Sequence, residues 1–168
     1  MTKRLSAAIV LSLTLALGAM APAWAMTPDY ASQYYLNSVC PQIPAWNSVI
    51  NALSQGNHLV RAGQVKGKRL RRVRAALLRL QRTDFTAASH LTNTPSEWPT
   101  TEAASATSKV ASALLRERLI IIELRTRSRQ SFARYWNRMF IPQDNRVDSY
   151  WRLALTSLSI PPNGRLGC

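Results

Sequence analysis

Apolar residues recur at the spacing of an α-helix along almost the whole chain, and this pattern limits the folds available to it. Trp46, Val49, Ile50 and Leu53, for example, follow the i, i+3, i+4, i+7 spacing of one helix face. No stretch of the sequence alternates with the period of two that indicates a half-buried strand. The 168 residues, 46% of them hydrophobic, suit one packed domain. The pattern therefore predicts an all-α antiparallel helical bundle.

Prolines, glycines and capping residues divide this pattern into five expected helices. We expect them at residues 27–40, 44–53, about 58–89, about 99–140 and about 145–160. Thr27 can cap the first helix. The third and fourth would form a long central hairpin around a loop at 91–99. We expect Pro142 to break the fourth helix and Asp144 or Asn145 to cap the last one.

Residues 1–25 have the organisation of a secretory signal peptide. Two cations precede an uncharged apolar run at 7–20, and Ala23-Trp24-Ala25 then gives a small-x-small cleavage site. A retained membrane anchor is the alternative, but the run is short for the ~20 apolar residues that span a bilayer. We expect cleavage after Ala25 and a single helical domain over 26–168. That domain would be secreted or held in the cell envelope, without a transmembrane segment.

The chain has two cysteines, Cys40 and Cys168. A compartment outside the cytosol favours a disulfide, and two cysteines leave only one possible pairing if they bond. Two unpaired thiols are the alternative. A bridge would join the end of the first helix to the last residue and so close nearly the whole domain.

Basic residues outnumber acidic ones so strongly that the formal net charge is +14. Nine cations and no acid lie between Asp29 and Asp84, and the segment from Lys109 to Arg138 holds eight cations and two glutamates. Most are arginines, whose planar fork fits phosphate and carboxylate groups. Helical geometry predicts outward-facing cations on two adjacent helices. The residues that we expect to contact a polyanion are Arg71, Arg72, Arg79, Arg82, Lys109, Arg116, Arg127 and Arg134.

These features favour a non-enzymatic protein that binds an anionic envelope component, such as phospholipid head groups, a wall polymer or another polyanion. A basic face that is merely solvated, reflecting composition bias, is the plain alternative. A second alternative is a partner-binding or inhibitor module that uses an apolar helix surface. The sequence contains no motif for sequence-specific binding of nucleic acid.

No arrangement of residues in the sequence predicts catalysis, a metal site or a cofactor. His58 and His90 flank the third expected helix and would lie ~45 Å apart if that helix is straight. The spacing suggests no Ser/His/Asp triad, and phosphate-loop and zinc-protease motifs are lacking. We therefore expect the chain not to be an enzyme.

Glu117 stands out because it falls inside the apolar stripe of the fourth expected helix. A buried carboxylate needs a partner or a proton. In a hairpin that turns near residue 95, position 117 lies opposite about position 73. We therefore expect an interhelical ion pair between Glu117 and either Arg69 or Arg74.

Three short stretches resemble small exported actinobacterial helical proteins of unassigned function. They are Tyr34-Tyr35-Leu36 leading to Val39-Cys40-Pro41, Trp98-Pro99, and the ending from Leu158-x-Ile160-Pro161-Pro162 to Gly167-Cys168. The resembling proteins are secreted or lipid-anchored. The resemblance implies a helical architecture and a Cys40–Cys168 bridge, and it implies no chemistry.

Overall fold

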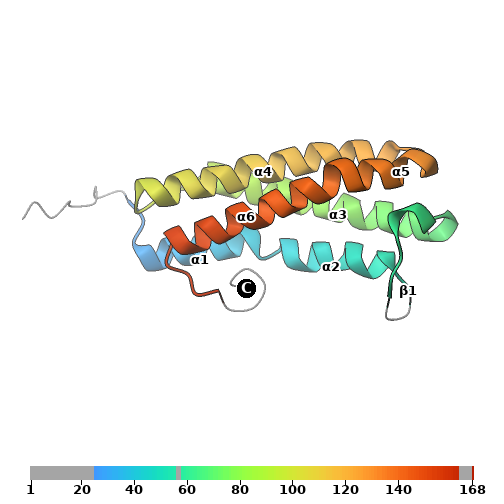
Figure 1. Cartoon of the computed structure of the whole chain (residues 1–168). Helices are drawn as coiled ribbons and strands as arrows, with labels where there is room; N and C mark the ends of the chain where they lie inside the picture. Colours follow the sequence, from blue (N-terminus) through green and yellow to red (C-terminus); the bar gives the residue numbers. More distant parts are fainter. Residues whose placement is uncertain (1–24, 56–57, 163–167) are drawn as a thin grey trace, which may run out of the picture.

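A computed structural model describes residues 25–55, 58–162 and 168, and it shows an elongated bundle of helices (Figure 1). The expected all-α antiparallel bundle is confirmed. The helical elements are α1 (Pro28–Val39), α2 (Gln42–Leu53), the 3-10 turn η1 (Ala62–Gln64), α3 (Gly67–Thr92), α4 (Thr101–Thr126), α5 (Arg129–Tyr135), the π-helical segment η2 (Trp136–Phe140) and α6 (Ile141–Ser157). Two residue pairs, β1 (Ser54–Gln55) and β2 (His58–Leu59), form a minimal antiparallel ladder. The expected signal peptide lies, apart from Ala25, outside the described residues.

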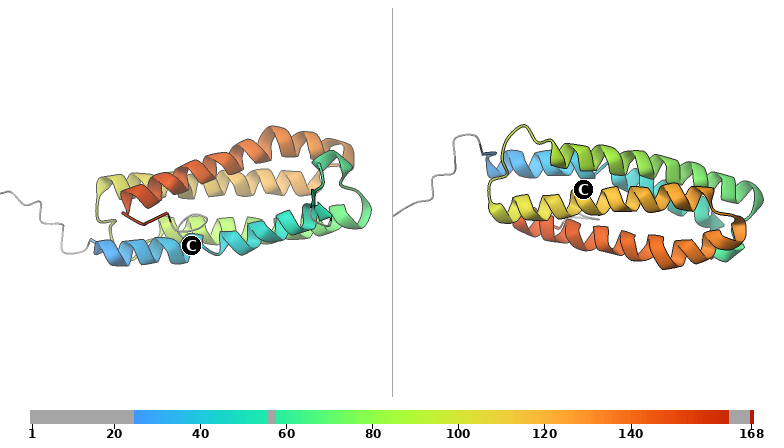
Figure 2. Two further views of the ribbon diagram at one scale, coloured as in Figure 1. Left: turned by 60° about the horizontal axis from the view of Figure 1, so that its bottom comes forward. Right: turned by 90° about the horizontal axis from the view of Figure 1, so that it is seen from above.

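The helices form four parallel or antiparallel rods, as the views in Figures 1 and 2 show. α1 and α2 follow each other along one rod, α3 and α4 form the expected central hairpin, and α5, η2 and α6 return along the fourth. α3 packs against α4 and α2, and α4 also packs against α6. Each rod thus covers the apolar stripes of its neighbours, which the sequence pattern requires.

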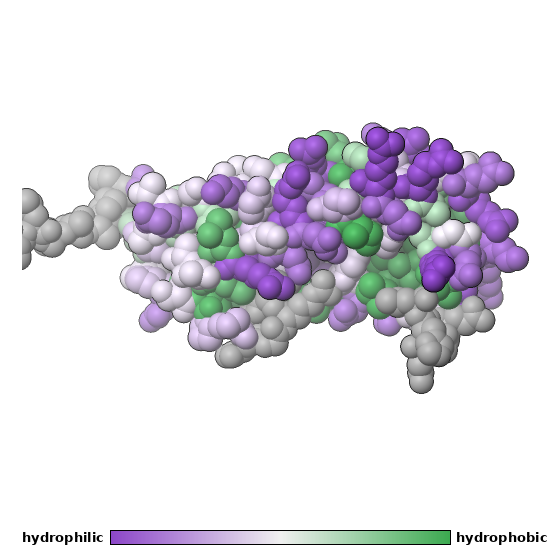
Figure 3. Space-filling view, viewed as in Figure 1, coloured by the Kyte–Doolittle hydropathy of each residue, from purple (hydrophilic) through white to green (hydrophobic). Residues whose placement is uncertain are grey.

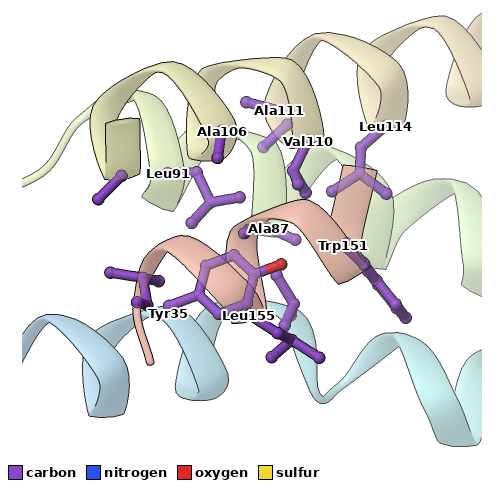
Figure 4. Close-up of a cluster of buried hydrophobic side chains, with 14 of the residues drawn as sticks. Tyr35, Ala87, Leu91, Ala106, Val110, Ala111, Leu114, Trp151 and Leu155 are labelled. Carbon is purple, nitrogen blue, oxygen red and sulfur yellow. The ribbon is translucent and has the colours of Figure 1, made fainter. Parts of the chain in front are cut away.

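The hydrophobic core has two parts along the bundle. One lies under α1, where Tyr35, Leu114 and Trp151 from three different rods meet (Figure 4). The other lies under α2, where Leu77, Ile121 and further apolar side chains pack together. An aromatic series completes it, in which Phe140 packs against Trp46 and Trp136 and Trp136 stacks on Phe132.

α3 begins at Gly67, nine residues after the expected start at about 58. Gly67 has a φ of +53°, which suits glycine because it has no Cβ. The residues before it form β2 and η1 instead, and η1 packs against α5. α2 also differs, since it begins at Gln42 and takes Pro44 into its first turn.

The prediction of one long helix over about 99–140 was wrong, because α4 ends at Thr126 and the chain reverses there. Ser128 caps the next helix, and its side chain accepts a hydrogen bond from the backbone N–H of Ser131. Pro142 breaks no helix: it lies at the start of α6, directly after the π-helical segment η2. α6 continues directly from η2, so the backbone around residue 144 is already helical and the expected cap at Asp144 or Asn145 does not form.

The expected disulfide is confirmed. The sulfur atoms of Cys40 and Cys168 are 2.00 Å apart, and the bridge spans 128 residues of sequence. At the opposite end of α1, the backbone N–H of the buried Met26 donates to the carbonyl of Glu97 at 2.8 Å. Both ends of α1 are thus tied to distant parts of the chain. None of the helices in the described ranges is long and apolar enough to cross a bilayer.

Candidate anion-binding site

Charge is distributed unevenly along the bundle. The segment from Arg61 to Arg74 carries seven cations and the segment from Arg125 to Arg138 carries five, with no acid in either. These segments meet at one end, because α3 runs antiparallel to α4 and η1 packs on α5. We call this the basic end. The other end holds the acidic residues Asp29, Glu97 and Glu102. Hydrophilic side chains crowd the basic end in Figure 3.

An open hollow of about 520 Å³ lies at the basic end, beside the start of α3. Four of its six lining residues are cations, namely Lys66, Lys68, Arg69 and Arg72, and the other two are Val60 and Gln64. We call it the cationic hollow. Lys68 and Arg72 are one helical turn apart, an i, i+4 pair of like charges that repel each other. A bound anion would relieve this repulsion.

The start of α3 is itself suited to an anion. Side chains of Thr27, Thr100 and Ser128 cap α1, α4 and α5, whereas no side chain caps α3 and no acidic residue lies in its first turn. The first N–H groups of a helix have no intrahelical acceptor and carry the positive end of the helix dipole. Together with the four cations, they make the cationic hollow a strongly electropositive site.

An apolar groove of about 640 Å³ adjoins the cationic hollow. Val60 and Gln64 line both, so the two hollows border each other at these residues. The groove lies between α2, η1, α5, η2 and the start of α6, and its apolar lining residues include Trp46, Ile50, Leu53, Ala62, Trp136 and Ile141. Neither lining, among the described residues, includes an acidic side chain. Figure 3 shows hydrophobic surface beside hydrophilic side chains in this part of the molecule.

The eight cations that the sequence singled out do not form one site. Seven are exposed and Arg127 is half-buried, but Lys109 and Arg116 lie away from the basic end. Together with Arg146 these two line a separate hollow of about 260 Å³ between α4 and α6. Arg127 forms an ion pair with Glu123 at 2.8 Å and stacks over Tyr135.

Three of the four cations that line the cationic hollow were not predicted from the sequence to contact an anion. Lys66 and Lys68 were not selected, and Arg69 was assigned to Glu117 instead. The available signal was the density of cations at the start of a helix without a capping residue. It was missed because the helix was expected to begin near residue 58 rather than at Gly67.

Glu117 is buried as expected, at 2% exposure, but the ion pair expected for it was wrong. The charged groups that act on its carboxyl are Asp84, Asp144 and Asp148, which raise its pKa further beyond the effect of burial. Arg74 donates instead to the backbone carbonyl of Arg127.

The hairpin register explains this difference. Arg118 of α4 lies over the ring of Phe85, 4.8 Å from its centre, and Arg125 donates to Gln81 at 2.8 Å. These contacts place Glu117 opposite Asp84 rather than opposite position 73, a shift of about three helical turns. The connection at 93–100 therefore does not reverse the chain symmetrically about residue 95. Within it, Glu97 forms an isolated bridge with Ala25.

Asp84 is completely buried, and burial is the main cause that raises its pKa. Gln42 and Arg118 lower it, and Asp144 raises it. Neither Asp84 oxygen has a hydrogen-bond partner of normal geometry, and the same holds for the Gln42 amide nitrogen and the Trp151 indole nitrogen. A cavity of about 20 Å³ beside Gln42, Glu117 and Trp151 has room for about one water molecule. In the described part of the chain, no group of three or more His, Cys, Asp or Glu residues is arranged to hold a metal ion.

Comparison of the chain with protein-family models, with curated proteins and with solved structures gives no match. A function for this protein can therefore be inferred only from the physical properties of the site.

Proposed function

We propose that this protein acts outside the cytosol as a non-enzymatic binder of an anionic component of the cell envelope, and that it binds through its basic end. The cationic hollow carries the proposal: four cations surround the uncapped start of a 26-residue helix. A surface that serves only solubility usually mixes charges of both signs, whereas the two segments that form the basic end carry only positive charges. The disulfide is compatible with an oxidising compartment.

The binding would be electrostatic and would involve no turnover. Phosphate or carboxylate oxygens accept hydrogen bonds from the guanidinium and ammonium groups and from the first N–H groups of α3. The long-range field of the basic end would attract the anion before contact. Because exposed charges are screened by salt, affinity should fall steeply with ionic strength.

The test compares two double charge reversals with identical net charge. Lys68→Glu with Arg72→Glu alters the cationic hollow, and Lys109→Glu with Arg152→Glu alters exposed cations elsewhere on the bundle. Each cation near an anionic surface contributes about 1 kcal/mol, so the first variant should bind polyphosphate at least about tenfold more weakly than wild type. The second should lose far less. Equal losses, or binding that is insensitive to salt, would contradict the proposal.

An exposed apolar stripe favours the second candidate, a module that binds a protein partner. Leu115, Leu119 and Ile122 of α4 are 39%, 59% and 36% exposed. Their i, i+4, i+7 spacing forms one strip on the outer face of the helix. Capture of an envelope protein by wild type, and its loss in Leu119→Gln with unchanged polyphosphate binding, would support this candidate.

A further inference from the structure

We infer that the basic end binds single molecules of an anionic phospholipid, with the phosphate in the cationic hollow and an acyl chain in the apolar groove. The inference rests on the proposed function and names its ligand class. Its basis is that the two hollows lie side by side, with Val60 and Gln64 lining both. A purely hydrophilic polyanion would use the cations and leave the groove uncovered.

The head-group half of the site follows from charge. Lys66, Lys68 and Arg72 are exposed, and together with Arg69 they surround the first turn of α3. A phosphate there would accept hydrogen bonds from side chains and from the N–H groups that no side chain caps. The conformation of Gly67, with φ of +53°, gives the backbone no Cβ at this point. A phosphate can therefore approach the chain closely.

The acyl half follows from the lining of the groove. Trp46, Val60 and Ile141 are each only partly buried, although they pack against the second hydrophobic core. Ile50, which also lines the groove, is partly buried as well. Leu53 and Trp136 close the floor of the groove, at 5% and 6% exposure. An acyl chain laid over these residues would remove apolar surface from water, which favours binding.

Both halves have the dimensions of ligand sites. Volumes of about 520 Å³ and 640 Å³ lie within the range of small-molecule pockets, roughly 300–1,000 Å³. The polar rim of the groove is provided by Arg61, Gln64 and Asn137, which face the solvent. The site thus changes from cationic to apolar across Val60 and Gln64, in the same order as the phosphate and chain of a phospholipid.

Tryptophan fluorescence gives a direct test, because bromine atoms on an acyl chain quench an indole only at contact. The probes are vesicles of equimolar phosphatidylcholine and phosphatidylglycerol with brominated acyl chains, and vesicles of brominated phosphatidylcholine alone. We expect quenching with the anionic vesicles only. In Trp46→Phe a large part of this quenching should be lost, and the remainder should come from Trp136 on the floor of the groove. In Trp98→Phe the quenching should persist in full, because Trp98 lines a different hollow with Leu91 and Thr101.

Two matched substitutions separate the groove from general apolar contact. Ile50→Gln places an amide in the groove, and Leu119→Gln makes a comparable change on the outer face of α4. Ile50→Gln should weaken binding to anionic vesicles by about tenfold and leave polyphosphate affinity unchanged. Leu119→Gln should change neither. The circular dichroism spectrum of each variant verifies that it is folded.

The possible outcomes distinguish the two proposals. If anionic vesicles and polyphosphate both bind but Ile50→Gln and Trp46→Phe behave as wild type, the lipid inference is overturned and the proposed function stands. If neither probe binds, both are overturned. If phosphatidylcholine alone binds as well as the anionic mixture, the lipid inference is overturned, and the polyphosphate measurement decides the proposed function. If Ile50→Gln loses vesicle binding and keeps its affinity for polyphosphate, the result supports both the lipid inference and the proposed function.

Discussion

The Asp84 carboxyl on α3 lies close enough to the Glu117 carboxyl on α4 to raise its pKa, and both groups are buried inside the bundle. Burial is the main reason that the pKa of each carboxyl is raised. Folding therefore favours the protonated forms of both. This contribution to stability is fully present below their ordinary values of 3.8 and 4.5 and is lost as the pH rises through the raised values.

Glu117→Gln should therefore stabilise the protein at neutral pH. The amide keeps the size of the side chain but removes a charge that burial disfavours and the repulsion from Asp84. We expect a gain of about 1 kcal/mol at pH 7.5, or roughly 2–4 °C in Tm, and almost none at pH 4. Urea unfolding at both pH values measures it. Glu102→Gln is the control, since Glu102 is exposed in the first turn of α4. A loss of stability in Glu117→Gln at pH 7.5 would show that a cation compensates this carboxylate.

Removal of the disulfide should cost much of the stability of the domain. The bridge between Cys40 and Cys168 spans 128 residues, which corresponds to about 5 kcal/mol in the chain-entropy model. Cys40→Ser with Cys168→Ser should therefore unfold at a much lower urea concentration. The slope of the free energy of unfolding against urea should also rise, because the unfolded chain exposes more surface. A loss below about 1 kcal/mol would mean that the unfolded state is restricted by other means.

Gly67→Ala should destabilise the protein, whereas Gly63→Ala should not. At φ of +53° an alanine Cβ meets its own backbone, which costs roughly 1–2 kcal/mol even though no other atom lies within 4 Å. At Gly63 the added Cβ would lie 3.9 Å from the Cβ of Ala133, an ordinary contact, so the expected change is within about 0.5 kcal/mol. Thermal unfolding of the two variants measures the difference. Equal melting temperatures would contradict the assigned conformation.

Ser128→Ala should weaken the reversal between α4 and α5. The Ser128 hydroxyl caps α5, and its loss should cost about 1 kcal/mol. Ser149→Ala is the matched control, because that exposed hydroxyl donates to the carbonyl of Asn145 within α6 and caps no helix. Chemical denaturation of both variants tests the prediction, and similar stabilities would argue that the reversal depends on packing alone.

Part of the candidate site was accessible from the sequence. The excess of cations and the absence of acids between Asp29 and Asp84 are sequence facts, and they predicted a basic surface. Which cations share a site was not accessible, because Lys66 and Arg72 come together only when Gly67 begins α3. The apolar groove could not be predicted either, since its lining comes from five separate helical elements.

The sequence by itself determined the helical class, the cap at Thr27, the Cys40–Cys168 pairing and the burial of Glu117. These depend on local rules: apolar spacing, capping groups and the count of cysteines. Only the tertiary structure decided that Glu117 faces Asp84 and that the cations collect at one end. The physical reason is that periodicity specifies the buried face of a helix, whereas the register between two helices depends on how their side chains pack against each other.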